Sequence, residues 1–183
     1  MKAKLKRTIV LIGMMGAGKT AVGTALARML GVPFVDSDDE IERAANMTVA
    51  EIFARDGEAF FRVKESQVLK RLLSGPPCVL STGGGAFLAE ANRQAIEAAG
   101  VSVWLRADLD LLWARVRHKA TRPLLRTADP KGTLARLLEA RAPIYGRAQL
   151  IVESEADLSV EDMAARVLAR LKAEGGIIVG GEA

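Results

Sequence analysis

The segment GMMGAGKT, residues 13–20, has the residue spacing of a phosphate-binding loop. It fits the pattern G-x-x-x-x-G-K-[ST], follows an apolar run and opens a helical pattern. Glycines let successive backbone amides turn inward around phosphate oxygens, and the N-terminus of a helix adds partial positive charge. A dinucleotide site does not fit, because Ala21 stands where that motif needs its third glycine. The segment therefore predicts a nucleoside-triphosphate site with Lys19 on the β- and γ-phosphates and Thr20 as a Mg²⁺ ligand, formed by Gly16, Ala17, Gly18, Lys19, Thr20 and Ala21.

A second segment, FVDSDDEI at 34–41, places acidic side chains directly after another apolar run. The simplest interpretation is a solvated turn followed by the acidic first turn of a helix. The alternative is that some of these carboxylates do chemistry beside the phosphate loop. The sequence of the segment alone does not decide between the two for Asp36, Asp38, Asp39 and Glu40.

A third segment, CVLSTGGGAF at 78–87, indicates which kind of nucleotide-binding protein this is. In many proteins with a phosphate-binding loop, a neighbouring strand ends in an Asp that helps to hold Mg²⁺. Here the strand ends in Ser81 and Thr82, and three glycines follow. These glycines could simply form a tight loop, but they would also let a ligand lie on backbone amides. The chain has no N-K-x-D segment for reading guanine. These features favour a small-molecule kinase over a switch GTPase.

The elements that must position these segments alternate along the chain. Five short apolar runs read as buried strands, at 8–12, 32–35, 78–81, 101–105 and 150–153. Helical patterns lie between them, at 19–30, 38–45, 49–55, 58–73, 89–99, 108–117, 131–141 and 159–173. This alternation predicts an α/β fold with a five-stranded parallel sheet flanked by helices. Two long connections, 36–76 and 118–130, have the character of binding subdomains or lids.

Composition sets the broad class. The 183 residues make one domain, half of them hydrophobic and with a net charge of +4, which suits a pocket for polyanionic small molecules as well as nucleic acid. A single Cys78 excludes an internal disulfide and points to a reducing compartment. No signal peptide or membrane span is predicted, so we expect a cytoplasmic protein. The N-terminal KAKLKR is expected to be frayed, and the tail at 175–183 has no assigned role.

Taken together, the chain resembles the shikimate kinase family. The matching segments occur in the family's order over most of residues 8–170: GMMGAGKT (13–20), FVDSD (34–38), GEAFFRVKE (57–65), STGGG (81–85), RPLL (122–125) and RAPIY (141–145). The resemblance implies transfer of the ATP γ-phosphate to the 3-hydroxyl of shikimate, with Mg²⁺, in aromatic amino-acid biosynthesis. It also implies a P-loop NTPase three-layer sandwich, a single domain over 1–183 with a substrate-binding region at about 36–65 and a lid at about 115–130, in a monomer.

The resemblance also implies the roles of individual residues. Shikimate would be bound by Asp38, Arg62, Gly84 and Arg141, with Gly83 and Gly85 shaping the same wall. Lys19, Asp38 and Arg122 would be catalytic, with Arg122 closing over ATP. Asp36 would hold a water of the Mg²⁺ shell, because magnesium keeps several waters.

These roles agree with the chemistry of the side chains. Shikimate carries a carboxylate, for which Arg62 and Arg141 offer planar bidentate donors. Asp38 can orient the attacking hydroxyl and accept its proton. Simpler interpretations stand beside these: Arg62 could only pair with Glu58 or Glu65, and Arg141 could be a solvated cation.

Three further groups of residues receive interpretations of their own. Arg122 could be only a surface charge of the lid. Asp39 and Glu40 are interpreted as favourable charges near a helix start. Tyr145 is interpreted as structural.

The resemblance weakens at the adenine site. Some relatives carry a basic residue and a proline after the fifth strand, where this chain has ESEADLSVED. Arg115 and Arg117 are both candidates for the adenine face. Three alternatives to a shikimate kinase are weighed: a kinase of another polyol such as gluconate, a regulatory module without turnover, and a nucleic-acid-binding protein. The last is disfavoured, because no basic stripe with interleaved aromatic residues is present.

Overall fold

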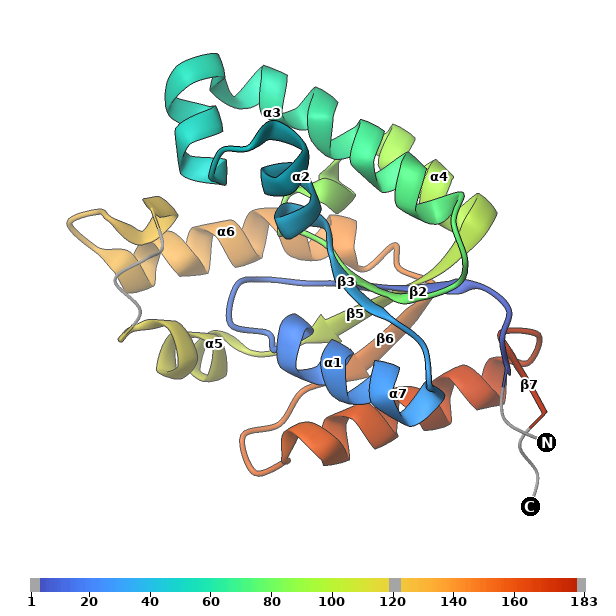
Figure 1. The fold of residues 1–183 in the computed structure, drawn as a ribbon. Coiled ribbons are helices and arrows are strands. Elements are labelled where there is room, and N and C mark those ends of the chain that lie inside the picture. Colours follow the sequence, from blue (N-terminus) through green and yellow to red (C-terminus); the bar gives the residue numbers. More distant parts are fainter. Residues whose placement is uncertain (1–3, 119–122, 181–183) are drawn as a thin grey trace.

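The computed structural model describes residues 4–118 and 123–180. Its centre is a parallel sheet with the strand order β3-β4-β2-β5-β6 (Figure 1). The strands are β2 (Thr8–Ile12), β3 (Phe34–Asp36), β4 (Val79–Ser81), β5 (Gly100–Arg106) and β6 (Leu150–Glu153). The central strand β2 is buried at all five positions, as its unbroken apolar sequence predicts. The predicted fold class, a five-stranded parallel sheet between helical layers, is confirmed.

Helices cover both faces of this sheet (Figure 1). One face is covered by α1 (Lys19–Leu30) and α7 (Val160–Glu174), which pack against each other. The other face is covered by α3 (Val49–Leu73), α4 (Glu90–Ala99) and α6 (Pro130–Tyr145). The remaining helical elements are α2 (Ser37–Ala45), α5 (Leu109–Val116) and the short 3-10 turns η1 (Ala86–Leu88) and η2 (Pro123–Leu125).

The core lies between the sheet and these layers, and it fixes the edge of the sheet where the strands end. Its fully buried side chains include Ile9, Leu11, Leu26, Leu80 and Leu105. Because all five strands are parallel, their carboxyl ends meet at one edge of the sheet. At this edge the segment 13–20 follows β2, the segment 36–40 lies at the end of β3, and the segment 82–85 follows β4. The fold therefore brings together segments that are far apart in the sequence.

One local expectation was confirmed and one was wrong. The break expected between the helical patterns at 49–55 and 58–73 lies inside α3 at Gly57, whose φ of 84° and ψ of 172° are non-helical. The helix expected to end at 141 continues to Tyr145 with Pro143 inside it. Tyr145 is fully buried, so tertiary contacts carry the helix past a residue that lacks a backbone donor.

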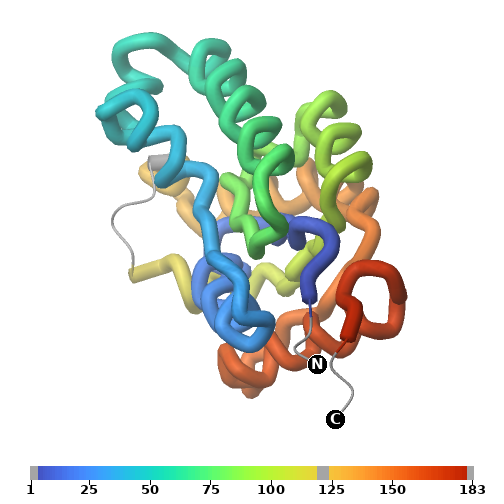
Figure 2. The backbone as a smooth tube through the Cα atoms, turned by 45° about the vertical axis from the view of Figure 1, so that its right-hand side comes forward, coloured from blue at the N-terminus to red at the C-terminus, as the bar shows by residue number. Residues whose placement is uncertain are grey.

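The N-terminal segment is also more ordered than its composition suggests. Within the expected frayed start, β1 (Lys4–Leu5) pairs antiparallel with β7 (Ile178–Val179) of the glycine-flanked tail. The Lys6 amide adds a hydrogen bond of 2.8 Å to the Ile177 carbonyl. This pairing brings the two ends of the chain close together (Figure 2). None of the helices in the described ranges is long and apolar enough to cross a membrane.

Candidate active site

A single cavity of about 790 Å³ opens at the carboxyl edge of the sheet. Its lining comes from the phosphate loop, the acidic segment after β3, the glycine segment after β4, and helices α3 and α6. The predicted binding residues in the described ranges meet here: Gly16, Ala17, Gly18, Lys19, Thr20, Ala21, Asp36, Asp38, Arg62, Gly83, Gly84, Gly85 and Arg141. The cavity therefore has a nucleotide-sized phosphate cradle on one side and a charged pocket on the other.

The phosphate cradle depends on backbone conformation. Gly16 and Gly18 have φ of 82° and 90°, in the left-handed region that favours glycine. The Lys19 ammonium donates to the Gly13 and Met14 carbonyls at 2.7 and 3.1 Å, which folds its side chain back over the loop. Arg115 of α5, which is not part of the loop, donates from its Nη1 to the Gly16 carbonyl at 3.0 Å. The cradle is thus preformed.

The charged pocket is organised by the glycine segment 83–85. A Cβ added at its first residue would lie 2.9 Å from Asp38 Oδ1, and one at its second residue 2.9 Å from Arg141 Nη1. A Cβ at its third residue would lie 2.6 Å from Arg62 Nη1. Each glycine thus makes room for one charged side chain, and three side chains from three different helices converge on a segment of three residues.

The polarity of the same segment suits an anion. The three carbonyls accept hydrogen bonds, from the amide of Ala86, the hydroxyl of Tyr145 and the amide of Leu88. Within the described residues, the three amides donate to no protein group. Donors that lie beside two guanidinium groups form a site for a carboxylate.

Two acidic side chains are buried in this pocket at an electrostatic cost. Burial and, to a lesser degree, the neighbouring charges of Asp36 and Glu65 together raise the pKa of Asp38 to about 6, against the opposing effect of Lys19. Burial also raises the pKa of Glu65, whose Oε1 accepts from Arg62 Nη1 at 2.8 Å. Asp38 Oδ1 and Glu65 Oε2 are buried without a hydrogen-bond partner among the described residues. Unsatisfied oxygens of this kind indicate a place for a ligand's donors.

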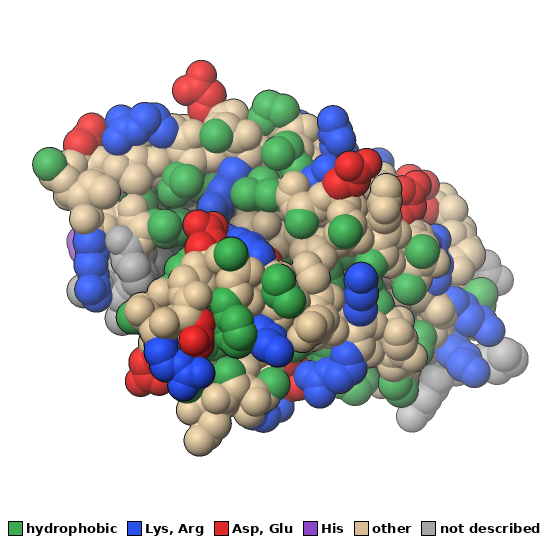
Figure 3. Space-filling model, turned by 90° about the horizontal axis from the view of Figure 1, so that it is seen from above, with side chains coloured by type: hydrophobic (Ala, Val, Ile, Leu, Met, Phe, Trp, Pro, Cys, Tyr) green, Lys and Arg blue, Asp and Glu red, His purple; other side chains and the backbone are tan. Residues whose placement is uncertain are grey.

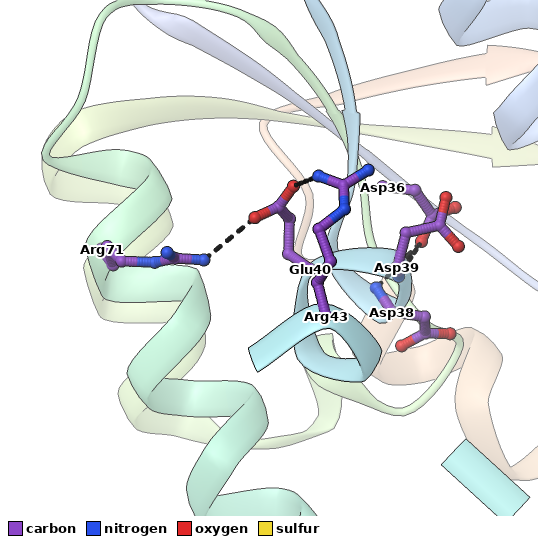
Figure 4. A network of polar contacts seen from close by, with 6 residues as sticks. All are labelled: Asp36, Asp38, Asp39, Glu40, Arg43 and Arg71. Atoms are coloured by element: carbon purple, nitrogen blue, oxygen red, sulfur yellow. Dashed lines mark hydrogen bonds and ion pairs between the residues drawn. The ribbon is translucent and has the colours of Figure 1, made fainter. Parts of the chain in front are cut away.

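The carboxylates of the acidic segment at 36–40 have different structural roles (Figure 4). Asp36 is the N-cap of α2, and its Oδ1 accepts from the amides of Asp38 and Asp39 at 2.9 and 3.3 Å. Burial raises the pKa of Asp36, against these two hydrogen bonds. Glu40 joins α2 to α3 by bonding Arg43 at 2.7 Å and Arg71 at 3.0 Å. Of the four carboxylates, Asp36 and Asp38 line the cavity.

Comparison with known proteins decides the family. The family model described as Shikimate kinase matches residues 15–172. The chain belongs to the shikimate kinase family.

Individual relatives agree. A protein named shikimate kinase from Cereibacter sphaeroides is 72% identical over 165 residues, which cover 90% of this chain and 82% of the relative. Another from Ruegeria pomeroyi is 68% identical, over 92% of this chain and 87% of the relative. The structure resembles that of the shikimate kinase from Acinetobacter baumannii in complex with shikimate, with a TM-score of 0.87, 38% identity and coverage of 93% and 95% of the two chains. The expected activity, an ATP-dependent kinase that phosphorylates shikimate, is thus confirmed, and the alternatives of another polyol or of a module without turnover are not favoured.

The three arginines that the family resemblance singles out need separate comment. Arg62 pairs with Glu58 and Glu65, as its simpler interpretation expects, and it also lines the cavity, so the pairing is compatible with the expected binding role. Arg141 is half-buried beside Gly84 and is not a solvated surface cation. Arg122 lies outside the described residues.

The structure separates the two adenine-site candidates. Arg115 lines the cavity and its Nη2 donates to Ser154 at 3.4 Å. Arg117 is exposed, and its Nε donates to His118 Nε2 at 3.0 Å. Arg115 is therefore the one of the two that lines the cavity beside the phosphate loop.

Sequence reasoning missed several residues of the cavity. Glu65 was considered only as a pairing partner of Arg62, although it is 1% exposed and adds a buried charge to the pocket. Apolar lining residues, Val49, Leu124, Leu158, Val160 and Met163, were not predicted. The capping box of Thr48 and Glu51 was a usable signal for Val49, because it fixes where α3 begins.

Proposed function

We propose that shikimate and ATP meet in this one cavity, with the 3-hydroxyl of shikimate in line with the γ-phosphate. The observation that supports this most is the convergence of Asp38, Arg62 and Arg141 on the segment 83–85 beside Lys19. The phosphate cradle holds ATP through its amides and Lys19. The bond between the γ-phosphorus and its bridging oxygen breaks as the acceptor oxygen bonds to phosphorus, giving ADP and shikimate 3-phosphate.

The two arginines bind the acceptor's carboxylate. Arg62 is held by Glu65, and Arg141 lies on Gly84, so both guanidinium groups have fixed positions before the acceptor binds. A planar guanidinium pairs with a carboxylate through two parallel hydrogen bonds. The free amides of the segment 83–85 add donors on the same side.

Asp38 orients the attacking hydroxyl and takes its proton. Its pKa of about 6 leaves it ionised at neutral pH while keeping it basic enough to accept a proton. Its unpartnered Oδ1 is the buried oxygen that an acceptor hydroxyl would satisfy. Lys19 stabilises the charge that develops on the transferring phosphoryl group.

Mg²⁺ completes the site in this proposal. Thr20 and Asp36 both line the cavity, and a hydroxyl with a carboxylate provides the oxygen donors that magnesium prefers. The described residues contain no cluster of three or more acidic, His or Cys side chains for a metal, which agrees with an ion held by few protein groups and by phosphates. Thr20 would hold it directly and Asp36 through water, where the ion would neutralise phosphate charge.

The proposal extends to the rest of the chain. Residues 36–65 form the substrate-binding region, since they supply Asp38, Val49 and Arg62 to the cavity. Residues 115–130 form the lid, from which Arg115 and Leu124 reach the cavity. Arg122, which lies outside the described residues, would close over ATP. In this proposal the enzyme is a monomer, because residues of one chain line the cavity, and it is cytoplasmic and binds no nucleic acid, as the sequence predicts. Light scattering tests the oligomeric state.

The decisive test is Asp38→Asn, assayed for ADP release with shikimate, ATP and Mg²⁺. We expect kcat to fall by roughly a hundredfold or more while ATP still binds, because the hydroxyl loses its acceptor. Asp39→Asn, at the exposed neighbouring carboxylate, is the matched control and should keep near-normal turnover. A near-normal kcat for Asp38→Asn would rule out its role as base. A panel of hydroxy acids in which gluconate is preferred would overturn the acceptor.

A further inference from the structure

Tyr145 is the last residue of α6 and has no exposed surface, yet it carries a hydroxyl. Its ring packs against Trp104 of β5, with centroids 5.7 Å apart. Trp104 in turn borders Gly13, where a Cβ would lie 3.4 Å from the indole Cδ1. The tyrosine therefore sits on the wall that separates the phosphate loop from the acceptor pocket.

The hydroxyl of Tyr145 contacts two parts of the acceptor pocket. It donates to the Gly84 carbonyl at 2.5 Å. The Arg141 guanidinium lies beside the same hydroxyl, since a Cβ at Gly84 would lie 2.9 Å from Arg141 Nη1 and 3.6 Å from the Tyr145 hydroxyl, and its charge opposes the effect of burial on the pKa of Tyr145. Burial dominates and raises that pKa, so the hydroxyl keeps its proton for Gly84 at neutral pH. Arg141 and Tyr145 are four residues apart on α6, which places them on one face of the helix.

The neighbouring carbonyls of this loop are held differently. Gly83 and Gly85 accept from backbone amides three residues ahead, at 3.1 and 3.2 Å, as in ordinary turns. Farther along, Asn92 of α4 donates to the Ala86 carbonyl at 2.9 Å. Gly84, the residue that faces Arg141, is held by the tyrosine instead. One hydroxyl thus orients a loop carbonyl and a guanidinium that the proposed function assigns to the same ligand.

We propose that Tyr145 is a positioning residue for the acceptor: its hydroxyl fixes the Gly84 peptide and the Arg141 guanidinium relative to each other and so sets where the acceptor's carboxylate binds. This rests on the proposed function, in which Arg141 binds that carboxylate. The tyrosine acts through these two groups and does not touch the reacting atoms. It affects the affinity for shikimate and leaves the affinity for ATP and the chemical step nearly unchanged.

The test is Tyr145→Phe, which keeps the ring against Trp104 and removes only the hydroxyl. We expect the KM for shikimate to rise about tenfold, the loss expected for one hydrogen bond to a charged or buried partner. The KM for ATP and kcat should change less than about threefold. If the variant melts below the assay temperature, calorimetric titration with shikimate below its melting point gives the same comparison.

The matched control is Thr8→Val at the opposite end of β2. Thr8 is 2% exposed and its Oγ1 accepts from the Cys78 amide at 3.3 Å, so the change also deletes a buried hydroxyl. It should lower the melting temperature and leave the KM for shikimate unchanged. Equal rises in the KM values for shikimate and ATP in Tyr145→Phe would reduce the tyrosine to a general stabilising role and overturn the inference.

A double-mutant cycle separates this inference from the proposed function. Arg141→Ala alone should raise the KM for shikimate, and adding Tyr145→Phe should then raise it less than about twofold further, because both act on one contact. An undiminished second effect would overturn the positioning role. If Arg141→Ala has no effect but Tyr145→Phe does, the carboxylate contact of Arg141 fails and so does the joint fixing proposed here. If only Tyr145→Phe is silent, this inference fails alone.

Discussion

Two glycine-rich segments meet at one edge of the sheet, and they need glycine for different reasons. In the phosphate loop, Gly16 and Gly18 have left-handed backbone conformations. In the segment 83–85, none of the three has a positive φ; a side chain there would instead collide with a charged group across the pocket. The phosphate loop needs glycine because of its own backbone conformation, and the segment 83–85 needs it to leave room for neighbouring side chains.

The difference shows how the two halves of the site are built. The phosphate loop is made by consecutive residues between one strand and one helix, so its geometry is local. The acceptor pocket is assembled from α2, α3 and α6 around a loop after β4, so its geometry depends on packing. The pocket also carries the energetic cost, since it buries carboxylates whose pKa values are raised. Figure 3 shows the outer face over α3 and α4, where charges of both signs are scattered among hydrophobic side chains. Repulsion between neighbouring carboxylates is thus a feature of the pocket and not of this outer face.

The largest effect is expected on the phosphate side. Lys19→Met should lower kcat by roughly a thousandfold or more, because the charge that develops in transfer loses a partner. The readout is ADP formation at saturating ATP and shikimate. Lys131→Met, at an exposed lysine that pairs with Asp110, is the control and should stay within about twofold. Retained turnover in Lys19→Met would show that the cradle's amides suffice.

The second prediction concerns the cost of the acceptor side. A carboxyl whose pKa is raised by folding stabilises the fold fully below its unfolded pKa of 3.8, and this contribution is lost as pH rises through about 6. Asp38→Asn should therefore raise the free energy of unfolding at pH 8 by roughly 2–3 kcal/mol and have little effect at pH 3. Thermal melts of the ligand-free protein at the two pH values measure it. A variant less stable than wild type at pH 8 would show that the pocket is not strained.

The third prediction tests the backbone role of glycine. In Gly16→Ala the alanine would have to adopt a positive φ, which is unfavourable for it. Its Cβ would lie 2.7 Å from Val116 Cγ1 and 3.2 Å from the Leu112 carbonyl oxygen. We expect a loss of about 2 kcal/mol in stability and a weaker affinity for ATP. Gly31→Ala shares the positive φ but meets no atom within 4 Å, so it should cost stability alone. Equal ATP affinities in the two variants would contradict a strained cradle.

The smallest effect separates the two kinds of glycine most sharply. Gly85→Ala would press only on the guanidinium end of Arg62, which can be displaced from Glu65 without moving the backbone, so the melting temperature should change little. The displaced guanidinium should raise the KM for shikimate about tenfold without changing that for ATP. Gly75→Ala, whose Cβ would meet only the Leu72 carbonyl at 3.4 Å, is the control. A rise in the KM for ATP instead would place residue 85 on the nucleotide side.

The same contrast explains what the sequence could predict. The phosphate loop, the five strands and the sheet type follow from local motifs and apolar runs, and all were found. The helix continuing past Pro143 and the pairing of β1 with β7 depend on contacts between distant residues, and they were missed. Asp38, Arg62 and Arg141 were reached by family resemblance, since nothing in their spacing shows that three helices bring them together. The burial of Glu65 and Tyr145 was likewise outside what local pattern reveals.

If the acceptor binds in this pocket as proposed, we expect its binding to be coupled to the ionisation of the buffer. Near pH 6 about half of the ligand-free molecules hold a proton on Asp38. A hydroxyl that donates to this carboxylate selects the ionised form, so each binding event releases about half a proton to the solution. The heat of titration with shikimate should then vary with the ionisation enthalpy of the buffer at pH 6, and the variation should vanish at pH 8. The number of protons released thereby reports directly on how the acceptor meets the protein.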